Sequence, residues 1–159
     1  MFLGKHCGGC GNGNQSCPIA KCSLQNGKIE YCYECIHYPC EKYSHIDEYD
    51  SFITHQHQKR DIRKAQEIGI EKYIAELIEK GNILEQLLSA YNDGRKKNFY
   101  CLAVNLLELS ELQETLKKVE TDITLSDLSK KDKISYIVKT FQDIADRKGI
   151  VLKLRKNSL

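Results

Sequence analysis

Between residues 46 and 159, apolar side chains recur at helical spacing and are separated by charged residues. Apolar residues three or four positions apart form one face of a helix, so the pattern predicts a body of about five helices. The stripes are Ile62, Ala65 and Ile68; Ile70, Tyr73, Ile74, Leu77 and Ile78; Leu84, Leu87, Leu88 and Tyr91; Phe99, Leu102, Leu106, Leu109, Leu112, Leu116 and Val119; and Ile134, Ile137, Val138, Phe141, Ile144 and Ala145.

Glycines and capping residues predict where several of these helices begin and end. Gly69 and Gly149 follow apolar stripes and are typical helix-ending residues. Ser129 has Asp132 three residues later, which predicts a cap at the start of the last helix. Gly81 predicts a break within the second long stripe, with one continuous helix across it as the alternative.

Three further elements are expected from local patterns. Ser44 with Asp47 predicts a first short helix. The longest stripe predicts a single amphipathic helix that ends near Glu120. The apolar residues at 150–154 predict a short C-terminal strand, for which the sequence identifies no partner strand.

The first 45 residues have a different composition, rich in Cys, Gly, Asn and Tyr and poor in aliphatic side chains. A segment of this kind buries too little apolar surface to fold without a metal or another cross-link. We therefore expect a mainly α protein, with a cysteine-rich metal-binding knuckle head at 1–45 and a helical body at 46–159. Seven of the eight cysteines lie in the head, at Cys7, Cys10, Cys17, Cys22, Cys32, Cys35 and Cys40.

The cysteine spacing leaves two ways to divide the metal ligands. In one, the two-residue gaps of Cys7/Cys10 and Cys32/Cys35 hold one zinc ion. The remaining cysteines then need a histidine to complete a second site, and His45 follows Cys40 at a suitable distance. In the other, one ion is held by four of the cysteines. An iron–sulfur cluster is the less favoured cofactor, because only Cys17-Pro18 resembles a ferredoxin motif and the other spacings do not match.

The net charge and the length of the apolar runs bear on whether the protein binds nucleic acid, enters a membrane or is secreted. The chain has 24 basic and 22 acidic side chains, a net charge of +2, which gives no strong field for nucleic acid or membrane. It has no signal-peptide pattern and no apolar run of membrane-spanning length, so we expect a soluble cytoplasmic protein. In a reducing cytosol, clustered cysteines favour metal thiolates over disulfides.

Several of these strings also resemble a known family. They are Cys7-Gly8-Gly9-Cys10, Cys17-Pro18-Ile19-Ala20-Lys21-Cys22, Cys32-Tyr33-Glu34-Cys35-Ile36-His37-Tyr38-Pro39-Cys40-Glu41-Lys42 and Asn92-Asp93-Gly94-Arg95-Lys96-Lys97-Asn98-Phe99-Tyr100-Cys101-Leu102-Ala103. Together they resemble an uncharacterised cysteine-rich family of bacteria and archaea, classed as a domain of unknown function and suspected of binding zinc. The resemblance implies a metal-binding head on a helical body, with no established substrate or reaction.

The sequence favours a zinc-binding module with a binding or regulatory role over an enzyme, since no catalytic or nucleotide-binding fingerprint is present. The alternative is a thiol-based redox or metal-handling protein, in which Cys101 is a reactive thiol or a ligand instead of a buried side chain. The run Arg95-Lys96-Lys97 before a predicted helix is a weaker indication of phosphate or nucleic-acid binding. The sequence identifies no specific partner.

Overall fold

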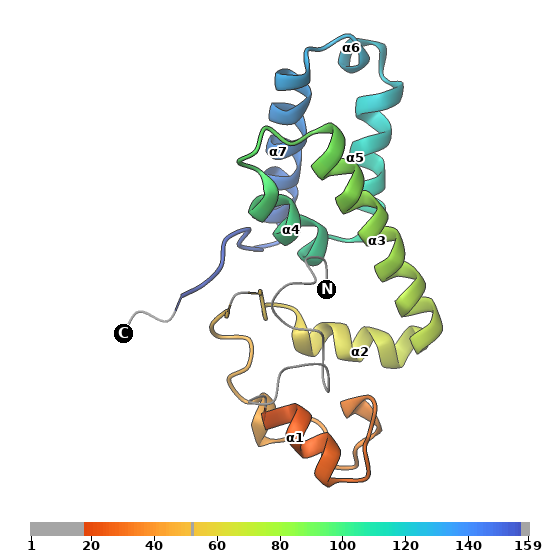
Figure 1. Cartoon of the computed structure of the whole chain (residues 1–159), viewed down its shortest axis with the longest axis vertical. Coiled ribbons are helices and arrows are strands. Elements are labelled where there is room, and N and C mark those ends of the chain that lie inside the picture. Colours follow the sequence, from red (N-terminus) through yellow and green to blue (C-terminus); the bar gives the residue numbers. More distant parts are fainter. Residues whose placement is uncertain (1–17, 52, 157–159) are drawn as a thin grey trace. The chain divides into compact units, whose positions relative to one another are not determined.

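The computed structural model describes residues 18–51 and 53–156, and within them the chain is mainly helical, as predicted (Figure 1). These residues form seven α-helices and two short 3-10 helices, and no strand. The elements are α1 (Pro18–Gln25), η1 (Cys32–Glu34), η2 (Glu41–Tyr43), α2 (Gln58–Ile68), α3 (Ile70–Ala90), α4 (Lys97–Leu106), α5 (Leu109–Thr121), α6 (Ile123–Ser126) and α7 (Lys130–Arg147).

The chain divides into two compact units, and the boundary falls within α3. Of the described residues, those up to Tyr73 together with 155 and 156 belong to the first unit. Residues Ile74–Leu154 form the second unit. The sequence places its change of composition earlier, after residue 45, and that division of the chain stays a prediction.

The second unit is a helical bundle with an apolar core. Its helix α5 packs against α7, and the short α6 lies where the chain turns between them (Figure 1). Several large side chains of this unit are fully buried, and burial of each contributes about 1.5–3 kcal/mol. Packing of the apolar faces therefore stabilises these helices more than intrinsic helix propensity does. The buried side chains include Leu87 of α3, Tyr100 of α4, Leu112 of α5, and Ile137 and Phe141 of α7.

Most predicted helix ends are confirmed. Gly69 follows α2 with φ +86°, and Gly149 lies just beyond α7 with φ +65°. The Ser129 hydroxyl accepts a hydrogen bond from the Asp132 N–H at the start of α7, at 3.3 Å. Helix α3 continues through Gly81, so the alternative of one unbroken helix is the correct one.

The single helix predicted from Phe99 to near Glu120 is wrong, because the chain breaks between α4 and α5. Leu107 has extended dihedral angles (φ −84°, ψ 157°) and ends α4. Glu108 then caps the start of α5, and its N–H donates to Glu111 Oε2 at 3.1 Å. At the break, Lys80 Nζ donates to the Leu107 carbonyl at 2.7 Å and satisfies a carbonyl that the helix leaves unpaired.

Two short elements expected from the sequence are absent from the described residues. Residues 150–154 form no strand, although Ile150 and Leu152 are buried and Val151 is exposed, as in a strand. A strand needs a partner for its backbone groups, whereas the Ile150 N–H donates to the Ala145 carbonyl of α7 at 2.8 Å. The helix expected after Ser44 is also absent, and η2 ends at Tyr43 before that position.

Candidate metal centre

The first cysteine that the structure describes lies on α1. Cys22 is partly buried near the end of this helix, and its carbonyl accepts a hydrogen bond from the Asn26 N–H at 3.0 Å. Gly27 then has φ +85°, which reverses the chain after the helix. The Ser23 hydroxyl donates to the Ile29 carbonyl and holds the returning chain against α1.

Two tight turns position the next three cysteines. Cys32 begins η1, and the Cys35 N–H donates to the Cys32 carbonyl at 3.1 Å, so both side chains project from one turn. Cys40 precedes η2, and the Tyr43 N–H donates to the Cys40 carbonyl at 2.9 Å. Helix α2 packs against η1 and supports this part of the first unit.

These turns and α1 enclose one small cavity of about 40 Å³. All four cysteines that the structure describes in the first unit line it: Cys22, Cys32, Cys35 and Cys40. Each is partly buried and carries a free thiol. Their side chains come from three segments of the chain, so the cavity brings together thiols that local spacing alone does not connect.

Two tyrosines lie beside the thiols in the wall of this cavity. Burial raises the pKa of Tyr43, and a hydrogen bond with the Cys32 side chain raises it further. Burial also raises the pKa of Tyr38, and the nearby Cys32 adds to that effect. The two rings pack edge to face with centroids 5.1 Å apart. The tyrosines therefore form an aromatic part of the cavity wall next to the thiols.

Two polar side chains adjoin the same thiols. Asn26 Nδ2 donates to Cys22 Sγ at 3.4 Å, and Lys42 is part of the cavity lining. Cysteine binds metal as the thiolate, and thiolate sulfur is one of the ligands that zinc prefers. The chemistry of this set thus fits a soft divalent ion such as zinc.

The four thiols are not arranged as the ligands of a metal ion are. Within the described part of the chain, no three or more His, Cys, Asp or Glu side chains are arranged so that they could hold a metal ion. Zinc needs four ligands at about 2.0–2.3 Å in a tetrahedron. The four thiols therefore share a cavity without forming that tetrahedron.

The structure groups the predicted ligands differently from the interleaved division. Cys22 and Cys40, expected at a second ion, line the same cavity as Cys32 and Cys35. His45 does not line it: the side chain is 79% exposed, and Nδ1 lies 2.6 Å from Glu48 Oε1. The remaining predicted ligands Cys7, Cys10 and Cys17 lie outside the described residues. The second site of the interleaved division, formed by Cys17, Cys22 and Cys40 with His45, stays a prediction.

The eighth cysteine, Cys101, lies on α4 in the second unit. It is partly buried with a free thiol. Burial raises its pKa, although Lys97 acts in the opposite direction. A thiol with a raised pKa is mostly protonated near neutral pH and reacts slowly, which favours a packing role.

Comparisons with known proteins do not identify the chain. No family model matches it, and neither the curated proteins nor the solved structures provide a match. The resemblance to the cysteine-rich family of unknown function therefore stays a prediction. Among the described helices, none is long and apolar enough to cross a membrane.

Two of the four tyrosines that lie among the cysteines in the sequence belong to the cavity wall. Tyr38 and Tyr43 line the cavity, whereas Tyr31 and Tyr33 stack on one another with centroids 5.5 Å apart. Ile19 also lines the cavity, three residues before Cys22 on the same helix. The spacing of Ile19 and Cys22 could have predicted that both line one cavity, because positions three apart share a helix face.

Proposed function

We propose that the first unit is a zinc-binding head, in which the thiolates of Cys22, Cys32, Cys35 and Cys40 hold one structural zinc ion. The observation that carries this proposal is the single cavity that these four thiols line. Four thiolates complete the coordination of zinc and leave no position for water or substrate. Such an ion stabilises the fold, and the protein acts as a binding or regulatory module instead of a zinc enzyme.

The small apolar core of the first unit supports a structural role for the metal. Among its described residues, the buried hydrophobic side chains are Ala20, Tyr43 and Ala65. This core is too small to offset the conformational entropy of folding. A structural zinc contributes on the order of 10 kcal/mol or more, which is the missing contribution.

The open arrangement of the thiols implies that metal binding and local folding are coupled. The sulfurs line one cavity, and they must converge to surround an ion. Convergence would draw α1, η1 and η2 together, because each carries or adjoins a ligand. We therefore expect the metal to order the first unit while the second unit folds on its own core.

The alternative function, thiol-based redox chemistry or metal transfer, is less well supported. It needs reactive thiols, and burial raises the pKa of Cys101 instead of lowering it. The thiols of the first unit are also partly buried, in a cavity that Tyr38 and Tyr43 help to line. A cytoplasmic location remains part of the proposal, because a reducing compartment keeps such thiols available for metal.

Metal analysis of the purified full-length chain tests this function. We expect at least one zinc ion for each chain, and a partial loss of helical circular dichroism when a strong chelator removes it. Restoring zinc should restore the signal. A metal-free chain with an unchanged spectrum and unchanged resistance to urea would overturn the structural role of the metal.

A further inference from the structure

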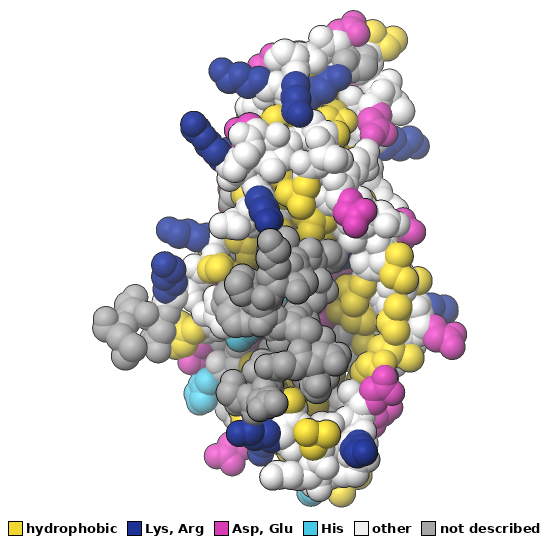
Figure 2. Space-filling model, viewed as in Figure 1, with side chains coloured by type: hydrophobic (Ala, Val, Ile, Leu, Met, Phe, Trp, Pro, Cys, Tyr) yellow, Lys and Arg dark blue, Asp and Glu magenta, His cyan; other side chains and the backbone are white. Residues whose placement is uncertain are grey.

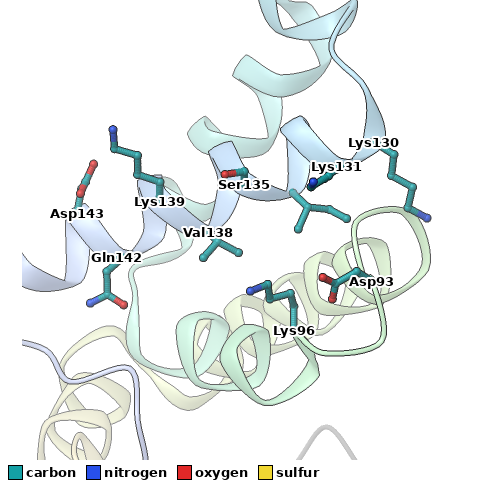
Figure 3. Close-up of a pocket in the computed structure, with 10 residues that line it drawn as sticks. Asp93, Lys96, Lys130, Lys131, Ser135, Val138, Lys139, Gln142 and Asp143 are labelled. Carbon is teal, nitrogen blue, oxygen red and sulfur yellow. The ribbon is translucent and has the colours of Figure 1, made fainter.

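A second cavity lies entirely within the second unit, between the start of α4 and one face of α7 (Figure 3). Its volume is about 750 Å³, within the roughly 300–1,000 Å³ typical of small-molecule sites. Lys131, Ser135, Val138 and Gln142 follow one another along α7 at spacings of four, three and four, so they share one face of the helix. Lys139, four residues after Ser135, lines the cleft beside them. Lys96 faces them from the other wall.

Positive charge dominates this cleft. Four lysines line it, at 96, 130, 131 and 139, against the two carboxylates of Asp93 and Asp143, which leaves an excess of two positive charges. Asp93 is already engaged, because its Oδ1 accepts the Arg95 N–H at 2.9 Å. In the part of the chain that the structure describes, none of the four ammonium groups forms an ion pair.

The position of Lys96 is set by a turn. Asn92 Oδ1 accepts hydrogen bonds from the Gly94 N–H at 3.0 Å and from the Lys96 N–H at 3.2 Å. Gly94 has φ +87°, a backbone conformation that favours glycine. Helix α4 begins at Lys97 with no acidic residue in its first turn, so its N-terminal dipole adds to the positive potential.

The cleft also has an apolar wall. Ile134 is buried and Val138 is partly buried, and both line the cleft between the lysines. Figure 2 shows apolar side chains at the surface of the second unit among lysine and arginine side chains. Ser135, which is exposed, adds a hydroxyl group to the wall. A purely inorganic anion would leave the apolar wall without a partner.

We propose that this cleft binds an organic phosphate of about the size of a nucleotide. The phosphate groups contact Lys96, Lys130 and Lys131, since ammonium groups are strong partners for multiply charged oxyanions. A planar or apolar body lies on Ile134 and Val138. This inference is independent of zinc, because every residue that lines the cleft belongs to the second unit.

ATP titrated into the full-length protein by calorimetry, in roughly physiological salt of about 0.15 M, tests the proposal. We expect saturable binding that is at least about tenfold weaker in the double variant Lys96→Gln/Lys131→Gln, because two charge-assisted contacts are lost. The matched control Lys117→Gln/Lys153→Gln removes two exposed charges outside the cleft and should change the affinity less than about twofold.

Two further measurements separate the parts of the proposal. Ser135→Glu introduces a carboxylate among the lysines without removing any of them, and should weaken ATP binding as strongly as the double lysine variant. Adenosine and pyrophosphate should each bind more weakly than ATP, since each lacks one half of the ligand. Absence of saturable ATP binding, equal loss in the control variant, or pyrophosphate binding as tight as ATP would overturn the proposal.

Discussion

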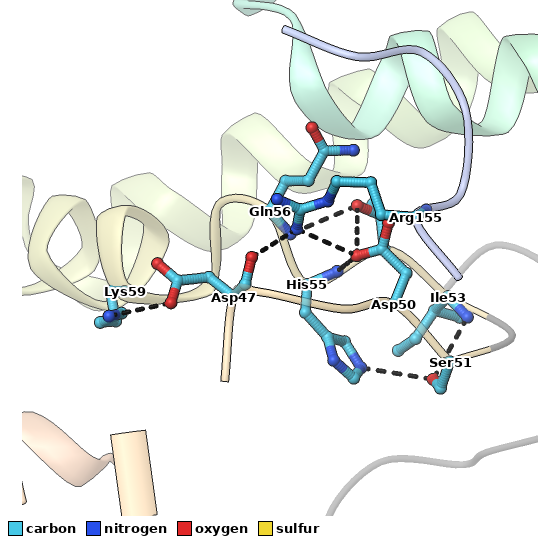
Figure 4. A network of polar contacts seen from close by, with 9 residues as sticks. Asp47, Asp50, Ser51, Ile53, His55, Gln56, Lys59 and Arg155 are labelled. Carbon is cyan, nitrogen blue, oxygen red and sulfur yellow. Dashed lines mark hydrogen bonds and ion pairs between the residues drawn. The ribbon is translucent and has the colours of Figure 1, made fainter. Parts of the chain in front are cut away.

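Asp50 and Arg155 are paired through both their main chains and their side chains (Figure 4). The Asp50 N–H donates to the Arg155 carbonyl at 2.8 Å, and the Arg155 N–H donates to Asp50 Oδ2 at 2.8 Å. Arg155 Nη2 lies 3.3 Å from Asp50 Oδ1, and the Asp50 side chain is fully buried. Both residues belong to the first unit, so this pair fixes the end of the described chain onto that unit.

This pair predicts a loss of stability in acid. Burial of the carboxyl raises the pKa of Asp50, but hydrogen bonds from Arg155 and His55 outweigh it and hold the pKa below its ordinary 3.8. The folded state therefore prefers the carboxylate. The contribution of Asp50 is complete above that ordinary value and is lost as the pH falls through the lower folded-state value.

Asp50→Asn should lower the free energy of unfolding at pH 7 by about 1–3 kcal/mol, because buried hydrogen bonds to a charge are weakened. The difference from the natural protein should shrink at pH values below the ordinary carboxyl range. Urea titrations at pH 7 and in acid measure both effects. Asp127→Asn, an exposed position, is the control. A deficit that stays constant with pH would contradict this account of Asp50.

Lys80 predicts a second stability effect, this one in the second unit. Its side chain is 5% exposed and donates to the Leu107 carbonyl at the break between α4 and α5. Lys80→Met keeps the apolar stem but leaves that carbonyl without this donor, so unfolding should become easier by about 1–3 kcal/mol. Lys72→Met, at an exposed position of the same helix, should change stability little. Equal effects of the two substitutions in thermal or urea unfolding would show that the Lys80 contact contributes nothing.

The position of the helices could largely be predicted from the sequence, whereas the break at Leu107 could not. The apolar stripe stays in register across it, because Leu106, Leu109 and Leu112 are spaced three apart. The cap at Glu108 is also weak as a sequence signal, since Ser, Thr, Asp and Asn are the usual capping residues. The strand predicted at 150–154 is wrong for a related reason. Alternation of apolar residues predicts that one face of a segment is buried, but it does not show whether a neighbouring strand is present to form hydrogen bonds.

The cysteines of the candidate site could be named from the sequence, whereas their grouping could not, and metal binding by them stays a prediction. The two-residue gap of Cys32 and Cys35 correctly placed both thiols on one turn. Spacing holds no information on which distant thiols join them, because that depends on how α1 and η2 pack. The lysine cleft was anticipated only at Lys96, since its other lysines lie more than thirty residues further along the chain.

Tyr43 tests whether the shell around the thiols affects the metal. Tyr43 is 3% exposed and lines the cavity together with Cys32. Tyr43→Phe removes the hydroxyl group while keeping the ring, and should weaken zinc binding about tenfold. Competition with a chromophoric chelator measures the affinity, with Tyr49→Phe at an exposed position as the control. Identical affinities in all three proteins would exclude a role for the Tyr43 hydroxyl.

Cys101 should behave as a packed side chain. Because burial raises its pKa, we expect alkylation by iodoacetamide near neutral pH to be at least about tenfold slower in the native protein than in denaturant. Peptide mass spectrometry follows this residue separately from the other thiols. Cys101→Ser should leave the zinc content unchanged. Rapid alkylation of Cys101 in the native protein, or loss of zinc in this variant, would instead favour the redox or metal-handling function.

The zinc-to-protein ratio of two cysteine variants tests the central claim most directly. In one variant the cysteines outside the described residues are replaced, Cys7, Cys10 and Cys17 to Ser, and in the other Cys22→Ser is combined with Cys40→Ser. We predict that the first variant retains one zinc ion and that the second loses the ion held by the cavity. Complete loss of zinc in the first variant, or an unchanged ratio in the second, would contradict a site formed by Cys22, Cys32, Cys35 and Cys40.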